Sequence, residues 1–387
     1  MSSPTDGRTR GRLWELAALF LRLGATAFGG PAAHVAMMHD EVVDRRKWIS
    51  EERFLDLLGA TNLVPGPNST EMAIHVGLIR AGWPGLIVAG ASFIVPAILI
   101  VLVMAWAYVR YGTTTAGEAL LYGIEPVVIA IIVRALVKLG STAVKRSVLL
   151  ASVGLATVAL YLASVNEIVL LVGAGMVVLV VRRIDRLRSA SPHSLVPLFP
   201  GLLPLAAATE ATQVELWRLF LQFLKFGFVV YGSGYVLFAF LQGDLVDKLG
   251  WLTQKQLVDA LAIGQLSPGP VFTTATFIGY LLGGVAGALV ATLGIFLPAF
   301  AFVALLQPIV RWIRRSTWAG DALDGVNVGA IGLMAGVSWQ LGREAIVDVP
   351  TLLLAVGALV VLFRFRLNSG WLVGAGAVAG LVITWAR

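Results

Sequence analysis

The chain has 387 residues, of which 58% are apolar and only 13% are charged, whereas soluble domains carry roughly 25% charged residues. With a mean hydropathy of +0.86, this composition excludes a soluble enzyme and predicts an all-α polytopic membrane protein, because the apolar runs do not alternate as barrel strands do. The net charge of +7 predicts basic cytoplasmic loops and requires no nucleic-acid partner. Cysteine is absent, which excludes disulfides and thiolate metal sites.

The first apolar segments of the chain are interrupted by glycine and proline. Residues 1–12 are polar and predict a cytoplasmic tail with no removable signal peptide. Segment 13–43 is broken at Phe28-Gly29-Gly30-Pro31, and segment 54–80 is broken at Pro65-Gly66-Pro67. Irregular backbone at membrane depth needs protein or a water-filled cavity around it, so broken helical hairpins point to a transport site. Ordinary proline kinks are the alternative.

Long uninterrupted apolar runs follow these hairpins. They approach or exceed the ~20 residues that cross a bilayer as a helix, and they lie at 86–109, 120–133, 148–165 and 168–181. A Pro-rich stretch at 195–208 offers a further, poorer crossing.

The chain contains an internal repeat. Displaced by 203 positions, residues 20–67 align without a gap with residues 223–270, and 14 of the 48 pairs are identical, against about three by chance. After one deletion the displacement is 202. We therefore predict two homologous transmembrane repeats, at 13–140 and 215–342. A connecting transmembrane region at 141–214 joins them, and a C-terminal transmembrane extension follows at 343–387.

The distribution of basic residues favours repeats of inverted topology. A path with a cytoplasmic N-terminus and a crossing at 195–208 places 20 basic residues inside and six outside, as cytoplasmic loops require. Because the path is chosen partly to satisfy this rule, the tally is a consistency check.

Several motifs resemble the chromate ion transporter (CHR) family. They are Phe28-Gly29-Gly30-Pro31 followed by His34, Lys47-Trp48-Ile49 leading to Phe54 and Asp56, and Asn62-Leu63-Val64-Pro65-Gly66-Pro67, all repeated more weakly in the second half. The resemblance covers about two thirds of the chain. It implies a bacterial inner-membrane exporter of chromate that is driven by the proton-motive force, confers chromate resistance and has a relation to sulfate handling. In the second half, Tyr231-Gly232-Ser233-Gly234 replaces the Gly-Gly-Pro turn and Leu237 replaces His34.

A tetrahedral dianion must exchange its water for fixed donors, and helix N-termini supply such donors. We expect it to bind between the two Pro-Gly-Pro breaks, near two cations at equivalent positions whose burial costs roughly 2.5 to 3.5 kcal/mol each. The predicted substrate-binding residues are Arg22, Gly29, Gly30, Pro65, Gly66, Pro67, Asn68, Ser69, Thr70, Lys225, Pro268, Gly269, Pro270, Thr273 and Thr274. The alternatives are a capping box between Asn68 and Glu71 and snorkelling of the two cations.

Titratable side chains are concentrated in the first repeat. We assign proton coupling to His34, Glu71 and His75, whose counterparts are Leu237, Thr274 and Ile278. Packed histidines and a capping carboxylate are the alternatives. Glu125 precedes Pro126 and aligns with Asn327, and the sequence assigns this polar pair no use.

The sequence therefore predicts a secondary active transporter with an oxyanion, protons and the lipid bilayer as partners, and with no cofactor, metal or nucleic acid. A membrane-embedded enzyme is disfavoured, because His34 and His39 lie five residues apart and about 140° apart on a helix. A sulfate carrier, a carrier of another oxyanion, a passive anion channel and a homodimer are left open.

Overall fold

The computed structural model describes residues 4–27, 30–61, 64–144, 147–188, 214–231, 234–305, 317–365 and 369–386. Within these ranges every regular element is helical, apart from one isolated antiparallel bridge between Pro65 and Tyr231. The all-α prediction is confirmed. Gly29 and the expected crossing at 195–208 lie outside the described residues.

The helices of the first half surround the two predicted breaks. In chain order they are α1 (Pro4–Thr26), α2 (Pro31–His39), the π-helix η1 (Asp40–Arg45), α3 (Glu51–Thr61), α4 (Asn68–Tyr111), α5 (Thr115–Ala143), α6 (Val148–Leu162) and α7 (Glu167–Arg188). The first break lies between α1 and α2, and α2 begins with a proline, whose missing N–H is no loss in the first turn of a helix. The second break lies between α3 and α4. Both predicted breaks are therefore present as interruptions between helices.

The second half repeats this order. Its elements are α8 (Leu216–Val229), α9 (Leu237–Phe240), the π-helix η2 (Leu241–Lys248), α10 (Gln254–Leu266), the 3-10 turn η3 (Val271–Thr273), α11 (Thr274–Leu305), α13 (Thr317–Ala345), α14 (Val349–Arg364) and α15 (Ser369–Ala386). Thr115 begins α5, and Thr317 begins α13, 202 positions later. The correspondence continues beyond residues 140 and 342, since α6 and α7 match α14 and α15 in order and spacing.

Each repeat contains one long helix with the same kink. In α4 the kink has Gly82 at φ 64° and ψ −151°, and in α11 it has Gly284 at φ 60° and ψ −150°. Residues with side chains rarely adopt such angles. The limbs on either side of each kink pack closely, because a Cβ at Gly77 or at Gly279 would collide with the carbonyl oxygen of Gly85 or Gly287.

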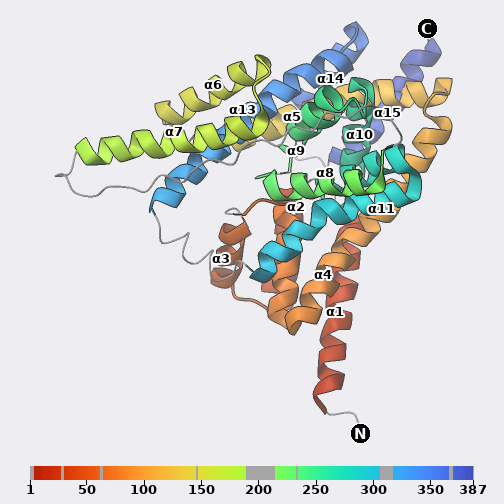
Figure 1. Ribbon diagram of the computed structural model, residues 1–387. Coiled ribbons are helices and arrows are strands. Elements are labelled where there is room, and N and C mark those ends of the chain that lie inside the picture. Colours follow the sequence, from red (N-terminus) through yellow and green to blue (C-terminus); the bar gives the residue numbers. More distant parts are fainter. Residues whose placement is uncertain are drawn as a thin grey trace.

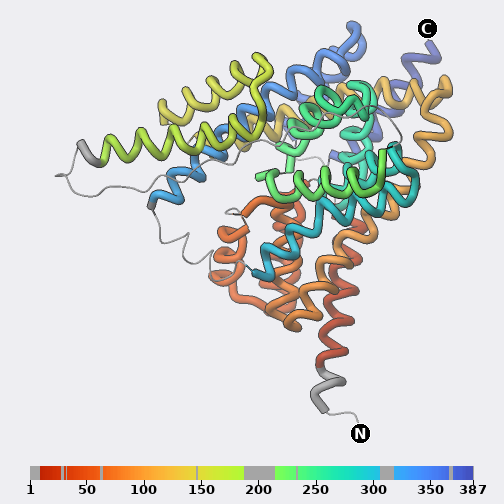
Figure 2. Tube along the Cα trace, in the orientation of Figure 1, coloured from red at the N-terminus to blue at the C-terminus, as the bar shows by residue number. Residues whose placement is uncertain are grey.

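The two repeats exchange helices around a pseudo-two-fold relation. Helix α4 packs on its counterpart α11, and α5 packs on its counterpart α13. The last two helices of each repeat pack on the other repeat, α6 and α7 on α13, and α14 and α15 on α5 (Figure 1). The chain begins at one extreme of the molecule and ends near the opposite one (Figure 2). Each repeat is thus completed by helices of the other.

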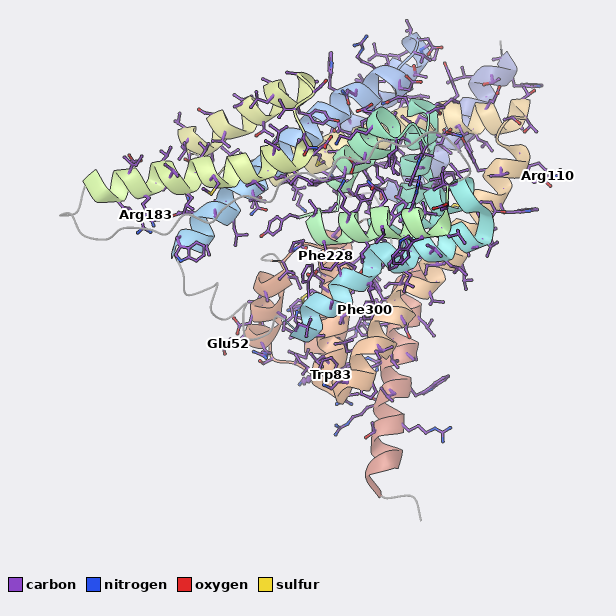
Figure 3. The ribbon with its side chains drawn as sticks, in the orientation of Figure 1. Glu52, Trp83, Arg110, Arg183, Phe228 and Phe300 are labelled. Carbon is purple, nitrogen blue, oxygen red and sulfur yellow. The ribbon has the colours of Figure 1, made fainter. Side chains whose placement is uncertain are left out.

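Five helices of the described ranges are long and apolar enough to cross a bilayer. They cover Asn68–Tyr111, Thr115–Ala143, Val271–Leu305, Trp318–Ala345 and Ser369–Ala386. Trp83 and Arg110 lie well apart on the second limb of α4 (Figure 3). At 1.5 Å per residue they are about 40 Å apart, close to the full thickness of a bilayer with its headgroups. An interfacial tryptophan and arginine at the ends of an apolar limb are typical of a membrane span.

The inverted orientation of the repeats is a prediction that labelling tests directly. Glu51 and Gln254 begin the equivalent helices α3 and α10. Because the chain has no native cysteine, a single-cysteine variant carries only the introduced thiol. We expect Glu51→Cys to react with a membrane-impermeant maleimide from the cytoplasmic side only, and Gln254→Cys from the outer side only. Reaction of both variants from one side would establish parallel repeats instead.

Candidate functional site

The two Pro-Gly-Pro breaks each contact the glycine-rich break of the other repeat. The backbone N–H of Gly66 donates to the carbonyl of Val230 at 2.9 Å, and the N–H of Gly269 donates to the carbonyl of Ala27 at 3.1 Å. Gly66 and Gly269 are equivalent at the displacement of 203, and so are Ala27 and Val230. The two hydrogen bonds are therefore equivalent under the pseudo-symmetry that relates the repeats.

This exchange satisfies backbone groups that the interrupted helices leave without partners. Unpaired N–H and C=O groups at membrane depth cost several kcal/mol each, and here each repeat supplies the acceptor for the other. Pro65 also forms the isolated bridge with Tyr231. Apart from the half-buried Pro65, both motifs are buried. The structure thus brings the Pro-Gly-Pro segments onto the opposite glycine-rich breaks, with protein around the irregular backbone.

His34 ties the first glycine-rich break to the start of α4. Its Nε2 lies 2.8 Å from the carbonyl oxygen of Ala27, and its Nδ1 lies 3.3 Å from the hydroxyl of Ser69. Because a carbonyl only accepts, Nε2 must carry a proton, and in the neutral ring Nδ1 accepts from the serine hydroxyl. The side chain is 1% exposed. The histidine assigned to proton coupling therefore lies at the contact of both breaks.

Helix α4 begins without a side-chain cap. Pro67 is the N-cap residue and makes no side-chain hydrogen bond, so the capping box proposed for Asn68 and Glu71 is not formed. The Thr70 hydroxyl is buried without a hydrogen-bond partner among the described residues, as is one oxygen of Glu71. Nδ1 of His75, one turn further along, is likewise buried and without a partner in the described part of the chain. The start of α4 therefore offers unused polar groups.

Glu71 reaches back into the first Pro-Gly-Pro break. A Cβ added at Gly66 would collide with its carboxylate oxygen Oε1, and Gly66 itself has φ 137°. The Glu71 side chain is 1% exposed. Glycine is therefore required at position 66 both for its backbone angle and for the space that the carboxyl group occupies.

The second break uses its hydroxyl groups internally. Thr273 donates to the Pro270 carbonyl at 2.8 Å, and Thr274 donates to the Val271 carbonyl at 2.9 Å. Both predicted threonines thus have their single donor committed to the backbone of their own turn. The second Pro-Gly-Pro segment, including Pro268, offers backbone rather than hydroxyl groups to a ligand.

Gln265 and Tyr235 are site residues that the sequence analysis did not assign. Gln265 lies three residues before the second Pro-Gly-Pro motif, and its Nε2 is buried with no partner among the described residues. The hydroxyl of Tyr235 lies against the other repeat, 3.1 Å from the position a Cβ would take at Gly30. The sequence did contain a signal for Gln265, because it aligns with Asn62, and both amides lie three residues before their Pro-Gly-Pro motif.

Arg22 and Lys225 find carboxylate partners at equivalent positions. Arg22 pairs with Glu41 of η1 at 2.5 Å, and Lys225 pairs with Asp244 of η2 at 2.5 Å. The cationic side chains are 52% and 38% exposed, whereas the acids are below 10%. The expectation that each cation has an anion or an acid beside it is met by an acid, and within the described residues no hydrogen bond or ion pair joins either cation to the breaks.

These ion pairs keep the acids charged. Burial acts to raise the pKa of Glu41, but Arg22, Arg45 and Arg46 together hold that pKa below its usual value. Burial likewise opposes ionisation of Asp244, and Lys225 with Lys248 lowers its pKa. Each pair therefore fastens a π-helix to the helix that precedes a glycine-rich break.

Comparison with known proteins identifies the family of the chain. The family model described as chromate transporter matches residues 14–179 and 217–381. A chromate transport protein of Cupriavidus metallidurans is 35% identical over 96% of this chain and 93% of its own length. A probable chromate transport protein of Synechococcus elongatus is 34% identical over 97% and 96%, and a chromate transport protein of Pseudomonas aeruginosa is 31% identical over 95% and 92%. No solved structure matches the chain.

The family match thus covers both halves, and the relatives span nearly the whole chain. The chain belongs to the chromate transporter family.

Proposed function

We propose that this protein is a secondary active transporter that exports chromate, a divalent tetrahedral oxyanion, across the bacterial cytoplasmic membrane at the expense of the proton-motive force, and thereby confers chromate resistance. Family membership and the names of the relatives support the substrate. The observation that carries the proposal is the reciprocal contact of the two Pro-Gly-Pro breaks with the opposite glycine-rich breaks. Sulfate is the second candidate, because its size, charge and geometry resemble those of chromate.

The substrate site that we propose lies between the two breaks. The uncapped start of α4, the Thr70 hydroxyl and the Gln265 amide supply donors that no described protein group uses. Fixed donors at a helix N-terminus suit an anion that has lost its water. The glycine N–H groups of both breaks become further donors when their bonds to the other repeat open.

The carboxyl group of Glu71 links anion binding at this site to protonation. Two unit charges 4 Å apart interact by about 4 kcal/mol at an effective dielectric constant of 20, so an ionised Glu71 and a dianion oppose each other strongly. Protonation of Glu71 therefore accompanies occupancy of the site by the anion. When the dianion leaves together with this proton, the net charge moved outward is −1, so the membrane potential, the electrical component of the proton-motive force, drives export by roughly 2.3 kcal/mol per 100 mV.

Arg22 and Lys225 enter the proposal as positioning residues. Their carboxylate partners on η1 and η2 make them parts of the frame that holds the glycine-rich breaks. The anion is therefore bound by neutral donors rather than by these cations.

The Thr70 hydroxyl is expected to contribute directly to chromate binding. Thr70→Val removes a buried, unused donor, and a hydrogen bond to a charged ligand contributes about 1.5 to 3 kcal/mol, which corresponds to a roughly 10- to 100-fold weaker affinity. Thr273→Val is the matched control, because its hydroxyl already bonds Pro270. Calorimetric titration of both purified variants with chromate measures the difference, and an equal loss in both would contradict the site.

Glu71 is expected to carry pH dependence in transport. Glu71→Gln imitates the protonated side chain, so chromate exchange in proteoliposomes should persist while its dependence on pH becomes weaker than in the parent. His34→Gln and His75→Gln test the other two predicted coupling residues in the same assay. The exposed Glu52→Gln on α3 (Figure 3) is the control and should keep the parental profile. Unchanged profiles in all three site variants would refute proton coupling in the first repeat.

The pair of Arg22 and Glu41 is expected to act on stability more than on affinity. Arg22→Gln leaves a buried carboxylate without its closest cation, so the melting temperature in detergent should fall, and the double variant Arg22→Gln with Glu41→Gln should recover part of the loss. Because the folded pKa of Glu41 is depressed, its contribution is present above its unfolded pKa and is lost as the pH falls through its folded pKa. Loss of chromate affinity in a well-folded double variant would instead show that Arg22 contributes to chromate binding.

A further inference from the structure

Two carboxyl groups from different repeats meet inside the protein, away from both Pro-Gly-Pro breaks. Glu125 projects from α5 and Asp259 from α10, and they are 7% and 0% exposed. Helix α10 packs on α5, and Lys255, one turn before Asp259 on α10, lies 3.5 Å from Glu125, so the two carboxyl groups are close neighbours that act on each other. A hydrogen bond between two carboxyl groups requires a proton on one of them.

The surroundings of the pair supply too few donors for two ionised carboxylates. The Tyr108 hydroxyl of α4 donates to Oδ2 of Asp259 at 2.7 Å, and the Lys255 ammonium lies at 3.5 Å from Oε1 of Glu125. Oδ1 of Asp259 is buried with no donor among the described residues. Two like charges this close in a buried site do not both ionise readily.

The other elements packed on α10 bring no further cation to the pair. Within the described residues, α15 and η3 contain no charged or titratable side chain, and α11 contains only Tyr280. Asp244 and Lys248 of η2 pair with each other, and Asp321 of α13 pairs with Arg182. The polar groups nearest to the carboxyl pair are Tyr108 and Lys255, and Glu118 of α5 acts in turn on Lys255.

We propose that Glu125 and Asp259 form a proton-binding site in which one shared proton holds α10 of the second repeat against α4 and α5 of the first. The inference rests on the proposed transport function for its role in coupling, although the proton site itself does not depend on the substrate. With one proton, the pair carries a charge of −1, which the Lys255 ammonium neutralises. Release of that proton leaves two buried carboxylates with a single nearby cation, and their repulsion acts to separate α10 from α5.

The location of the pair connects it to both breaks. Tyr108 lies near the end of α4, the helix that begins directly after the first Pro-Gly-Pro break, and Asp259 lies on α10, which ends directly before the second. Movement of α10 away from α4 and α5 therefore moves the second break relative to the first. Protonation at this site thereby controls the contact on which the substrate site depends.

The pair exists once, although the repeats are homologous. The counterpart of Asp259 is Asp56, which is exposed on α3, and the counterpart of Glu125 is Asn327. The aspartate is therefore kept in both repeats, whereas the position of its carboxyl partner Glu125 is occupied by an amide, Asn327, in the other repeat. This asymmetry provides a matched control for each experiment.

Infrared spectroscopy of the purified protein without substrate tests the proton site. The parent is expected to show a protonated-carboxyl absorption that disappears as the pH is raised. That band should be missing from Asp259→Asn and from Glu125→Gln, and it should remain in Asp56→Asn and in Glu71→Gln. A parental spectrum in both pair variants, or a loss of the same band in Asp56→Asn, would overturn the proposal.

Chromate counterflow in proteoliposomes, at equal pH on both sides, tests the coupling. The amide variants imitate a permanently protonated pair, so their exchange should lose the decline at alkaline pH that the parent shows, whereas Asp56→Asn should behave as the parent. If the parent shows the infrared titration but no chromate counterflow, the proposed function fails and the proton site stands. Retention of the parental alkaline decline by Glu125→Gln, the milder variant, would overturn the coupling even where Asp259→Asn fails to fold.

Discussion

The fold depends on one constraint, which is that backbone groups at interrupted helices inside a membrane need partners. The chain meets it reciprocally: Gly66 of the first repeat donates to Val230 of the second, and Gly269 of the second donates to Ala27 of the first. Neither repeat can satisfy its own break, so the breaks are held together as long as no other acceptor is present. An oxyanion is such an acceptor. In the substrate site that we propose, such an anion would replace a carbonyl as the partner of a glycine N–H, and its binding would be linked to separation of the repeats at that point.

The symmetric frame carries an asymmetric set of polar groups. In the first break, His34 lies between Ala27 and Ser69, and Glu71 reaches into the space beside Gly66. In the second break, the threonine hydroxyls bond their own turn. The first break therefore holds the groups that can change charge, whereas the second holds groups that stay neutral and fixed. Such a division allows a proton to bias one side of a contact whose backbone geometry is the same on both sides.

The local structure was readable from the sequence because it follows from local rules. Closely spaced glycine and proline, as at Gly30, Pro31 and Pro65, disfavour continuation of a helix, and the displacement of 203 relates these breaks to the second half. The side chains that contact each other across the fold could not be predicted from such local rules. Asp56 and Asp259 are identical and aligned, yet one is exposed and the other is buried beside Glu125, because the contact is made by a helix far away in the chain.

The same limit explains Arg22 and Lys225. Their equivalence was visible in the alignment, but whether each faces a ligand or an acid depends on how η1 and η2 fold back on α1 and α8, and a π-helix has no simple periodic signature. Glu41 and Asp244 are themselves aligned at the displacement of 203. Two cations and two acids that keep the same spacing in both repeats are better explained by an ion pair than by a ligand site, since a pair requires both partners to be retained together.

The exchange of terminal helices indicates which parts of the molecule move. Helices α6 and α7 pack on α13 of the other repeat, and α14 and α15 pack on α5, while α5 and α13 pack on each other. The central helices α5 and α13 of this interlocked group are largely buried, and no Pro-Gly-Pro break interrupts its described helices, so it is the stiffer part of the fold. Helix α10 is attached to this group through polar contacts such as that of Lys255 with Glu125 of α5, and it is bound to α4 by the hydrogen bond from Tyr108 to Asp259. Because that bond and the adjoining carboxyl pair connect a hairpin helix to α4 and α5, a single proton there can act on the position of an entire break, which side-chain changes within the break alone would not achieve.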